Sequence, residues 1–204
     1  MTGVVCFDRN RLALDDIVAI ARGAARPVLS PDPAFRAFIT RGADFLDGLL
    51  LEDGAIYGVT TGYGDSCTVP VPLALVTELP HHLYTYHGCG LGSFLSPFET
   101  RAVMAARLAS LAKGFSGVSM ALLEQIVRLF DADLLPLIPS EGSVGASGDL
   151  TPLSYLAAVL CGEREVLRGG VPMPAADALR EAGIAPLRLR PKEGLAIMNG
   201  TAVM

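Results

Sequence analysis

Residues 142–152 place glycine at three positions, each three residues apart, and then continue into a Thr-Pro pair. Because glycine adopts backbone angles that other residues avoid, this spacing predicts a turn whose backbone is strained or lies close to another group. Thr151 and Pro152 predict the start of a helix, and the residues that follow to Leu160 are almost all apolar. The chain is therefore expected to bury this helix behind the turn and so hold the turn rigid.

At the centre of the stretch, Ala146, Ser147 and Gly148 have the groups needed for a backbone cyclisation. Attack of the Gly148 amide nitrogen on the Ala146 carbonyl carbon, with loss of one water, would close a five-membered imidazolone ring. Loss of the Ser147 hydroxyl as water would then leave an exocyclic methylidene, which is a strong electrophile. Asp149 follows directly and could assist proton transfer. The sequence therefore predicts a prosthetic group made from the chain itself, with no external cofactor.

Two binding functions compete with cyclisation as explanations. An Ala-Ser-Gly triplet occurs by chance in about one chain in fifteen of this length, and a glycine-rich turn before a helix could instead bind an anion. Against the anion site, no Lys-Ser or Lys-Thr pair follows, and the dinucleotide-binding spacing is absent. The other alternative is a zinc site, although its candidate ligands match no common spacing. They are His81, His82, His87 and Cys89.

The composition argues against some partners and leaves apolar surface to be covered. The formal net charge is −5 at pH 7 and no basic face is evident, so nucleic acid is not expected as a partner. Hydrophobic residues make up 51% of the chain and charged residues 18%, and a large oligomer interface or a missing C-terminal half would account for that excess. With no secretory signal, no membrane-spanning run and four scattered cysteines, the sequence predicts a cytoplasmic protein with reduced thiols and no membrane partner.

Apolar periodicity, prolines and helix caps predict a mainly α-helical domain across residues 1–204, with a few short β-strands. The clearest helix start is Ser96-Pro97-Phe98-Glu99, a capping box with proline at the first helical position. The expected helices span residues 15–22, 33–54, 72–86, 97–113, 119–136, 152–160 and 174–182. The expected strands are residues 11–14, residues 28–29 and a hairpin over 166–171. The segment 57–72 is broken by glycine yet almost uncharged, which favours a functional loop.

Four separate stretches share a pattern with one known family. They are Tyr-Gly-Val-Thr-Thr-Gly-Tyr-Gly at 57–64, Tyr-His-Gly-Cys-Gly-Leu-Gly at 86–92, Gly-Ser-Val-Gly-Ala-Ser-Gly-Asp-Leu at 142–150 and Met-Asn-Gly-Thr at 198–201. In order and approximate spacing they resemble the N-terminal part of the histidine, phenylalanine and tyrosine ammonia-lyases. The resemblance spans essentially the whole chain, which is most similar to the histidine-type members.

The resemblance implies a catalytic centre that agrees with the cyclisation chemistry. Ala146, Ser147 and Gly148 would form the family's 4-methylideneimidazol-5-one group, to which the α-amine of an amino acid adds. Tyr57, on a mobile loop, would be the base that removes a β-proton of the substrate. A tyrosine can act in this way only if its phenol is partly ionised, so positive charge or helix N-termini must lower its pKa.

The resemblance also implies that Asn199 hydrogen-bonds the imidazolone carbonyl and that Tyr86 and His87 form the pair that selects the substrate side chain. Histidine-specific members usually have Ser-His at this pair, phenylalanine-type members Phe-Leu and tyrosine-type members His-Leu. His87 could bind an imidazole or accept from a phenol, so histidine, giving urocanate, and tyrosine, giving coumarate, both remain open. Residues 60–64 also differ, with Thr-Thr-Gly-Tyr-Gly where the family usually has Asn-Thr-Gly-Phe-Gly.

Finally, the resemblance implies a longer protein. Family members continue into a C-terminal part of long helices, which forms the core of a homotetramer and contributes to sites shared between subunits. This chain stops at Met204, so we expect it to lack that bundle and to be inactive alone. The alternatives to an ammonia-lyase are an aminomutase, which uses the same electrophile, and a non-catalytic scaffold of the same fold.

Overall fold

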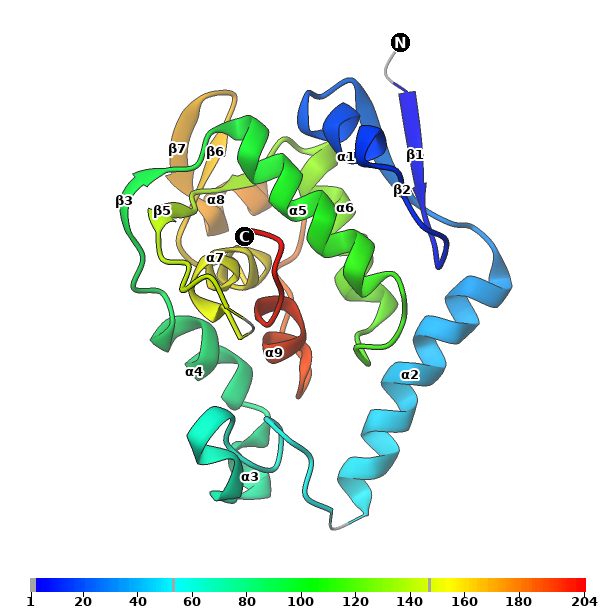
Figure 1. Cartoon of the computed structure of the whole chain (residues 1–204), viewed down its shortest axis with the longest axis vertical. Coiled ribbons are helices and arrows are strands. Elements are labelled where there is room, and N and C mark those ends of the chain that lie inside the picture. The colour runs from blue at the N-terminus through cyan, green and yellow to red at the C-terminus, as the bar shows by residue number, and fades with distance from the viewer. Residues whose placement is uncertain (1–2, 53, 147) are drawn as a thin grey trace.

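The structure is a computed structural model that describes residues 3–52, 54–146 and 148–204. Ser147, one of the three residues of the predicted cyclisation, lies outside the described residues. Helices dominate the fold (Figure 1). They are α1 (Leu14–Ala21), α2 (Pro33–Leu51), α3 (Leu73–Val76), α4 (Leu79–Tyr86), α5 (Pro97–Leu111), α6 (Met120–Asp131), α7 (Leu150–Leu160), α8 (Ala175–Glu181) and α9 (Glu193–Met198), with a 3-10 helix at Gly64–Thr68.

The strands are short and form three small sheets. They are β1 (Gly3–Phe7), β2 (Ala25–Leu29), β3 (Leu91–Phe94), β4 (Leu135–Pro136), β5 (Pro139–Glu141), β6 (Glu165–Arg168) and β7 (Val171–Pro174). β1 and β2 pair in parallel, β3 and β5 pair antiparallel, and β4, β6 and β7 form an antiparallel sheet in that order. The mainly α-helical fold with a few short strands is thus confirmed.

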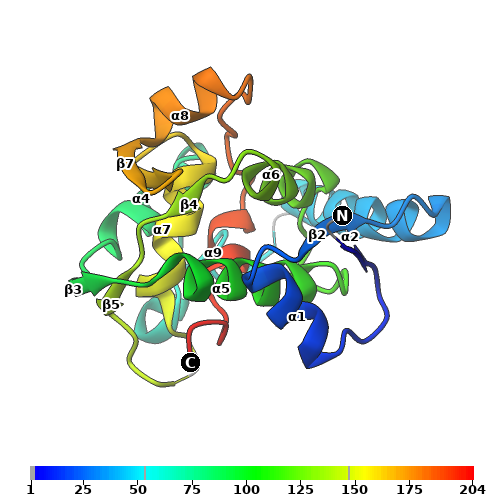
Figure 2. The same ribbon diagram turned by 90° about the horizontal axis from the view of Figure 1, so that it is seen from above.

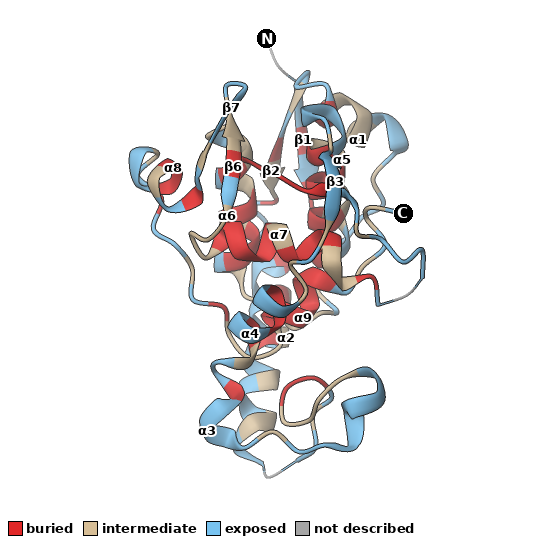
Figure 3. Ribbon diagram, turned by 90° about the vertical axis from the view of Figure 1, so that its left-hand side faces the viewer, coloured by how far each residue is buried: buried red, intermediate tan, exposed pale blue. Residues whose placement is uncertain are grey.

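The core is built around α5, α6 and α7, whose inward faces are fully buried (Figure 3). α7 is the most enclosed of them, since Leu153, Leu156 and Leu160 have no exposed surface. It packs against both α4 and α9, and those two helices also pack against each other. Seen from above, α9 lies between α7 and α5 (Figure 2). The helix that the sequence places behind the glycine-rich turn is therefore buried, as predicted.

Local signals at helix starts hold in the structure. At α5, the Ser96 hydroxyl accepts from the Glu99 amide at 3.3 Å, and the Glu99 carboxylate accepts from the Ser96 amide at 2.8 Å. The Ser96 hydroxyl also donates to the Glu99 carboxylate at 2.7 Å, and this bond, followed by the bond from the Ser96 amide, lowers the pKa of Glu99. Asp32 caps α2 by accepting from the Ala34 amide at 2.9 Å. At α2 and α5 a side chain next to the helix in sequence bonds one of its free amides, so these two starts are specified locally.

The segment from Gly54 to Glu78 forms one end of the molecule, beyond α4, and much of it is exposed (Figure 3). It contains the 3-10 helix, an isolated bridge between Thr61 and Pro70, and α3. Val59 and Val76 are its buried residues of large apolar type. Few apolar contacts anchor this end, as is common for a functional loop.

Three expected elements differ in the structure. The strand expected at 11–14 is wrong, because β1 lies earlier and Leu14 already begins α1. The helix expected over 72–86 is divided into α3 and α4, because Pro80 has no N–H to donate to the Val76 carbonyl and so ends the first helix there. The helix expected to reach Pro136 ends at Asp131, since Asp133 has a φ of 53° and turns the chain away.

Candidate active site

The glycine-rich stretch is the connection between β5 and α7. Ala146 and Gly148 are both exposed, and Gly148 has a φ of +83°, a conformation that side chains disfavour. A Cβ added to Gly148 would meet no described atom within 4 Å, so open space rather than packing surrounds it. The stretch is therefore a surface turn mounted on the N-terminus of a buried helix.

Asp149 anchors this turn from below. Its side chain is only 2% exposed, and its carboxylate accepts from the Ser143 hydroxyl at 2.5 Å and from the Val144 amide at 3.0 Å. The Ser143 hydroxyl in turn accepts from the Gly145 amide at 3.1 Å. The sequence suggested proton transfer for Asp149, and the structure adds that this buried carboxylate holds residues 143–145 in place.

The loop that carries Tyr57 packs against α9. The Tyr57 side chain is 47% exposed, and its phenol oxygen accepts from the Gly64 amide at 2.9 Å. The Lys192 ammonium donates to the Tyr57 carbonyl at 3.3 Å and lies 5.8 Å from the centroid of the Tyr57 ring. Partial burial lowers the pKa of Lys192. Gly58 has a φ of +66°, and a Cβ there would overlap the Leu195 side chain of α9.

Tyr86 and His87 lie where α4 ends. Tyr86 is 80% exposed, whereas the His87 ring is held by a contact of 2.8 Å between its Nδ1 and the Leu83 carbonyl. A carbonyl oxygen only accepts, so Nδ1 carries a proton, and in the uncharged tautomer with this arrangement Nε2 is the acceptor. The Tyr63 ring lies 6.0 Å from the His87 ring, between centroids, and the Tyr86 ring 5.2 Å. Burial, and to a lesser degree Tyr86, raises the pKa of Tyr63.

Asn199 follows the last residue of α9, and its side chain is exposed. Its backbone carbonyl accepts from the Arg107 guanidinium at 3.2 Å, and the Ala196 carbonyl accepts from the same group. Arg107 is 5% exposed and, among the described residues, no partner for its Nε is found. Burial lowers the pKa of Arg107 to about 10. This arginine supports the Asn199 turn from α5.

The four motif stretches meet around three helices that pack on one another. The Tyr57 loop lies on α9 through Leu195 and Lys192, as described above. The turn after α4 reaches α7 through a contact of 3.9 Å between the Cys89 sulfur and the Thr151 hydroxyl. Among the described residues, no hydrogen bond joins the side chains of Tyr57, His87 or Asn199 to the backbone of the reactive turn.

Sequence reasoning missed Arg107 and Tyr63 as parts of this region. Arg107 sits in an apolar helix stripe, and nothing near it in sequence indicates that it would reach Asn199. Tyr63 could have been found, because it stands where the family's loop usually has phenylalanine. Its place beside His87 is seen only in the structure. Both contacts depend on packing between distant segments.

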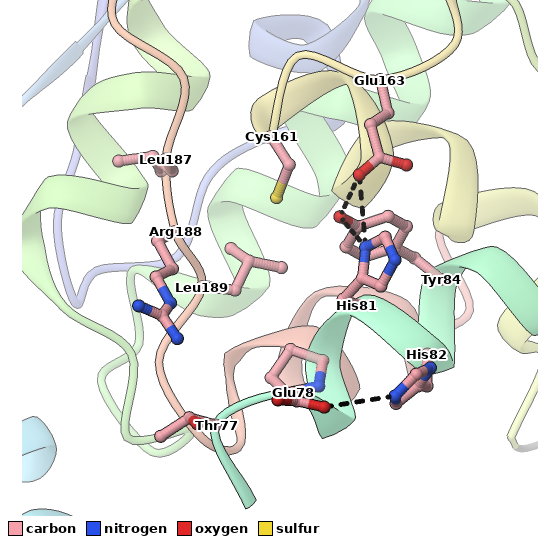
Figure 4. A pocket seen from close by; sticks show the side chains of 11 residues that line it. Thr77, Glu78, His81, His82, Tyr84, Cys161, Glu163, Leu187, Arg188 and Leu189 are labelled. Atoms are coloured by element: carbon pink, nitrogen blue, oxygen red, sulfur yellow. Dashed lines mark hydrogen bonds and ion pairs between the residues drawn. The ribbon is translucent and has the colours of Figure 1, made fainter. Parts of the chain in front are cut away.

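A separate cavity of about 330 Å³ is lined by residues of α4, of the connection after α7 and of the segment before α9 (Figure 4). Its main polar cluster joins His81, Tyr84 and Glu163: the Tyr84 hydroxyl donates to Glu163 at 2.8 Å and lies 2.9 Å from the His81 Nδ1. Burial, followed by the bond to Glu163, raises the pKa of Tyr84, and burial raises the pKa of Cys161 to about 11. None of the residues predicted to be catalytic or to bind substrate lines this cavity, although His81 and His82, two of the candidate zinc ligands, do.

The zinc alternative gains no support from this geometry. In the part of the chain that the structure describes, no group of three or more His, Cys, Asp or Glu side chains is arranged to hold a metal ion. His81 faces Tyr84, His82 lies 3.8 Å from Glu78, and His87 faces Leu83.

A family model described as aromatic amino acid lyase matches residues 12–204. The chain belongs to the aromatic amino acid lyase family. Among its curated relatives, the histidine ammonia-lyase of Gloeobacter violaceus is 41% identical over 204 residues, which is 100% of this chain and 39% of the relative. The histidine ammonia-lyase of Homo sapiens is 38% identical, over 97% of this chain and 30% of the relative. The chain therefore spans well under half the length of these curated family members.

Solved structures of other family members show the same fold. A tyrosine aminomutase from Streptomyces globisporus superposes with a TM-score of 0.90 at 37% identity, covering 98% of this chain and 37% of that one. A histidine ammonia-lyase from Trypanosoma cruzi gives 0.86 at 30% identity, covering 98% and 38%. In the chain described here, no helix among the described residues is both long and apolar enough to cross a membrane.

Proposed function

We propose that the protein eliminates ammonia, without oxidation, from an aromatic L-amino acid, and that the substrate is histidine or tyrosine. Membership of the aromatic amino acid lyase family supports carbon–nitrogen lyase chemistry. The observation that carries the proposal to this site is the meeting of the four motif stretches around α4, α7 and α9, which pack on one another. We treat residues 1–204 as the domain that holds these motifs.

Residues 146–148 fit a ring made from the backbone. Ala146 and Gly148 are exposed, Gly148 has the open, positive-φ conformation that only glycine adopts freely, and buried Asp149 fixes the residues just before them. Once formed, the 4-methylideneimidazol-5-one ring supplies the electrophile that receives the substrate α-amine. A rigid base under the turn favours cyclisation because it limits the conformations that the reacting atoms can adopt.

Tyr57 is the proposed base for the substrate β-proton. Its phenol oxygen accepts the Gly64 N–H, and the Lys192 ammonium lies beside its ring. A tyrosine side chain takes a proton only as the phenolate, which nearby positive charge of this kind would stabilise. The phenol is half-exposed on a loop, which leaves it open to an incoming amino acid.

His87 is the proposed contact for the substrate ring. Because its Nδ1–H donates to the Leu83 carbonyl, the uncharged imidazole would have Nε2 free to accept from a substrate. An acceptor there favours a ring that donates, which is the phenol of tyrosine or the imidazole N–H of histidine, over phenylalanine. Tyr63 and Tyr86, whose rings both lie near the His87 ring, would pack against the substrate ring.

Asn199 is the proposed partner of the imidazolone carbonyl. Its amide is exposed, while its backbone is fixed through Arg107. A side-chain N–H donated to the carbonyl would draw electron density from the ring and so make the methylidene more electrophilic.

The mass of the purified chain tests this proposal first. A loss of two water molecules that maps to a peptide spanning Ala146–Gly148, and that disappears in Ser147→Ala, is the expected result. Release of ammonia from histidine or tyrosine, reduced at least a hundredfold in Tyr57→Phe, is the expected activity of the whole protein. A peptide of unaltered mass in a preparation that releases ammonia would refute the role of the ring.

An aminomutase is the second candidate, because the match to the tyrosine aminomutase of Streptomyces globisporus combines a TM-score of 0.90 with 37% identity. It would return the amine to the β-carbon, so a β-amino acid product separates it from a lyase. A chain that keeps the fold but never cyclises would instead be a scaffold. Assembly as a homotetramer and a cytoplasmic location stay predictions from the sequence.

A further inference from the structure

The turn that carries Tyr86 and His87 is hydrogen-bonded, through Tyr84, to two consecutive residues of the connection between α7 and β6. The Glu163 carboxylate accepts from the Tyr84 hydroxyl at 2.8 Å (Figure 4), and the Arg164 guanidinium donates to the Tyr84 backbone carbonyl at 3.0 Å. Both ends of Tyr84, which is 3% exposed, are thus tied to the same short segment. The last turn of α4 cannot move without breaking one of these bonds.

The Arg164 guanidinium also fills the space over Gly88. A Cβ added to Gly88 would overlap the guanidinium, so any side chain at position 88 would have to displace it. The guanidinium lies 4.2 Å above the centroid of the Tyr155 ring, where the cation is attracted to the aromatic face. The Tyr155 hydroxyl in turn accepts from the Gly90 amide at 3.1 Å. Residues on both sides of His87 are therefore held by one stacked pair.

Arg164 holds this position in an uncommon backbone conformation. Its φ is +64°, a region that glycine enters freely and other residues seldom occupy. Its carbonyl accepts from the Ala175 amide at 2.8 Å, which fixes the backbone at this point. A glycine would suit this conformation better. The presence of arginine here therefore indicates that its side chain contributes something that glycine cannot.

We propose that Arg164 is a positioning residue, which fixes the turn at Tyr86 and His87 and thereby sets how sharply His87 discriminates between substrate rings. This inference rests on the proposed function. The Nδ1–H bond to Leu83 sets the tautomer of His87, while the guanidinium packed on Gly88 sets where the backbone that carries His87 lies. Loosening that backbone lets the ring move away from the substrate donor, so discrimination falls before binding is lost.

A double-mutant cycle between Gly88→Ala and Arg164→Gly tests the positioning role. Arg164→Gly suits the positive φ, so it removes the side chain without adding backbone strain. The readout is the set of His87 imidazole resonances in ¹⁵N NMR spectra of the purified chain, with urea unfolding to show that each variant folds. Each single change should shift or broaden the His87 signals. Adding Gly88→Ala to Arg164→Gly should change them no further, because the guanidinium is gone.

Arg180→Ala is the matched control, since Arg180 is exposed on α8 and pairs with Asp177. It should leave the His87 signals unaltered. Unaltered His87 signals in Arg164→Gly, or effects of the two changes that simply add, would overturn the positioning role.

Discrimination is measured on the active protein as the ratio of kcat/KM for the better of histidine and tyrosine to that for phenylalanine, whose ring has no donor. Arg164→Gly should lower this ratio about tenfold, and Arg164→Lys should recover part of it. Shifted His87 signals with an unaltered ratio would refute the effect on substrates. If the whole wild-type protein, with its C-terminal part, turns over no amino acid, the proposed function fails, while the NMR cycle on the purified chain still decides the positioning role.

Discussion

Glu193 binds Ser119 across 74 residues of sequence: its carboxylate accepts from the Ser119 amide at 2.9 Å and from the Ser119 hydroxyl at 2.7 Å. The same carboxylate accepts from the Arg190 amide at 2.8 Å and is 3% exposed. Because Ser119 caps α6 and Glu193 begins α9, one buried carboxylate joins the starts of two helices.

We expect Glu193→Ala to lower the free energy of unfolding by about 3 kcal/mol, because it leaves buried donors without an acceptor. Glu193→Gln keeps one acceptor oxygen and should cost about half as much. Urea unfolding followed by circular dichroism measures both, with exposed Glu52→Ala as the control. A loss below about 1 kcal/mol in Glu193→Ala would show that the carboxylate is not needed at this junction.

Removal of the Asp149 carboxylate should slow cyclisation of the reactive turn. Asp149→Ala frees the Ser143 hydroxyl and the Val144 amide, so residues just before the reactive turn lose their anchor. The fraction of the Ala146–Gly148 peptide that has lost water, measured by mass spectrometry after a fixed time, should fall severalfold. Asp149→Asn, which keeps one acceptor, should fall between Asp149→Ala and the wild type. Full dehydration in Asp149→Ala would show that the anchor is dispensable.

Stability should fall between pH 9 and pH 11 because of Cys161. Burial raises the pKa of this thiol from 9.0 to about 11 in the folded protein. The unfolded chain therefore loses the proton first, binds fewer protons within this window, and is favoured as the pH rises. The loss attributable to Cys161 is about 2 kcal/mol, after allowance for its partial exposure.

The difference between wild type and Cys161→Ala reports the effect of the thiol together with its coupling to Tyr84, because the groups remote from Cys161 are the same in both proteins. Urea unfolding at several pH values should show the wild type losing more stability than the variant across the window. Parallel stability curves for the two proteins would mean that burial does not perturb the thiol.

Arg107 should support the Asn199 turn through its charge-assisted hydrogen bonds. Arg107→Ala leaves the Ala196 and Asn199 carbonyls without this donor and opens a cavity, for a loss of about 3 kcal/mol in the free energy of unfolding. Arg107→Met refills the volume and should recover part of that loss. Both should shift the Asn199 amide signals in NMR spectra, whereas exposed Arg22→Ala should not. Equal stability of Arg107→Ala and wild type would contradict this role.

The elements that the sequence predicted well are those controlled by neighbouring residues. The start of α5 follows from Ser96 and Glu99, and the burial of α7 follows from its run of apolar residues. The division between α3 and α4 was also readable in principle, since Pro80 lacks the N–H that a continuous helix needs. At six residues, α9 is too short to show a periodic pattern.

The supporting residues of the site could not be predicted in the same way. Arg107, Glu193 and Arg164 each act on a segment at least 74 residues away, and no local pattern specifies such a partner. The roles of Tyr57, His87 and Asn199 came from the family resemblance, and they stay predictions. What the fold adds is the set of side chains that hold the backbone around them.

The late place of α9 in the chain has a consequence for the order in which the protein matures. A ribosome makes the reactive turn about 50 residues before it reaches Asn199, which at ordinary elongation rates is a delay of about 3 to 10 s. α9 can pack on α7 and α4 only after its residues have been made. Cyclisation that depends on this packing would begin only once α9 has left the exit tunnel, so the turn would stay unreacted until then.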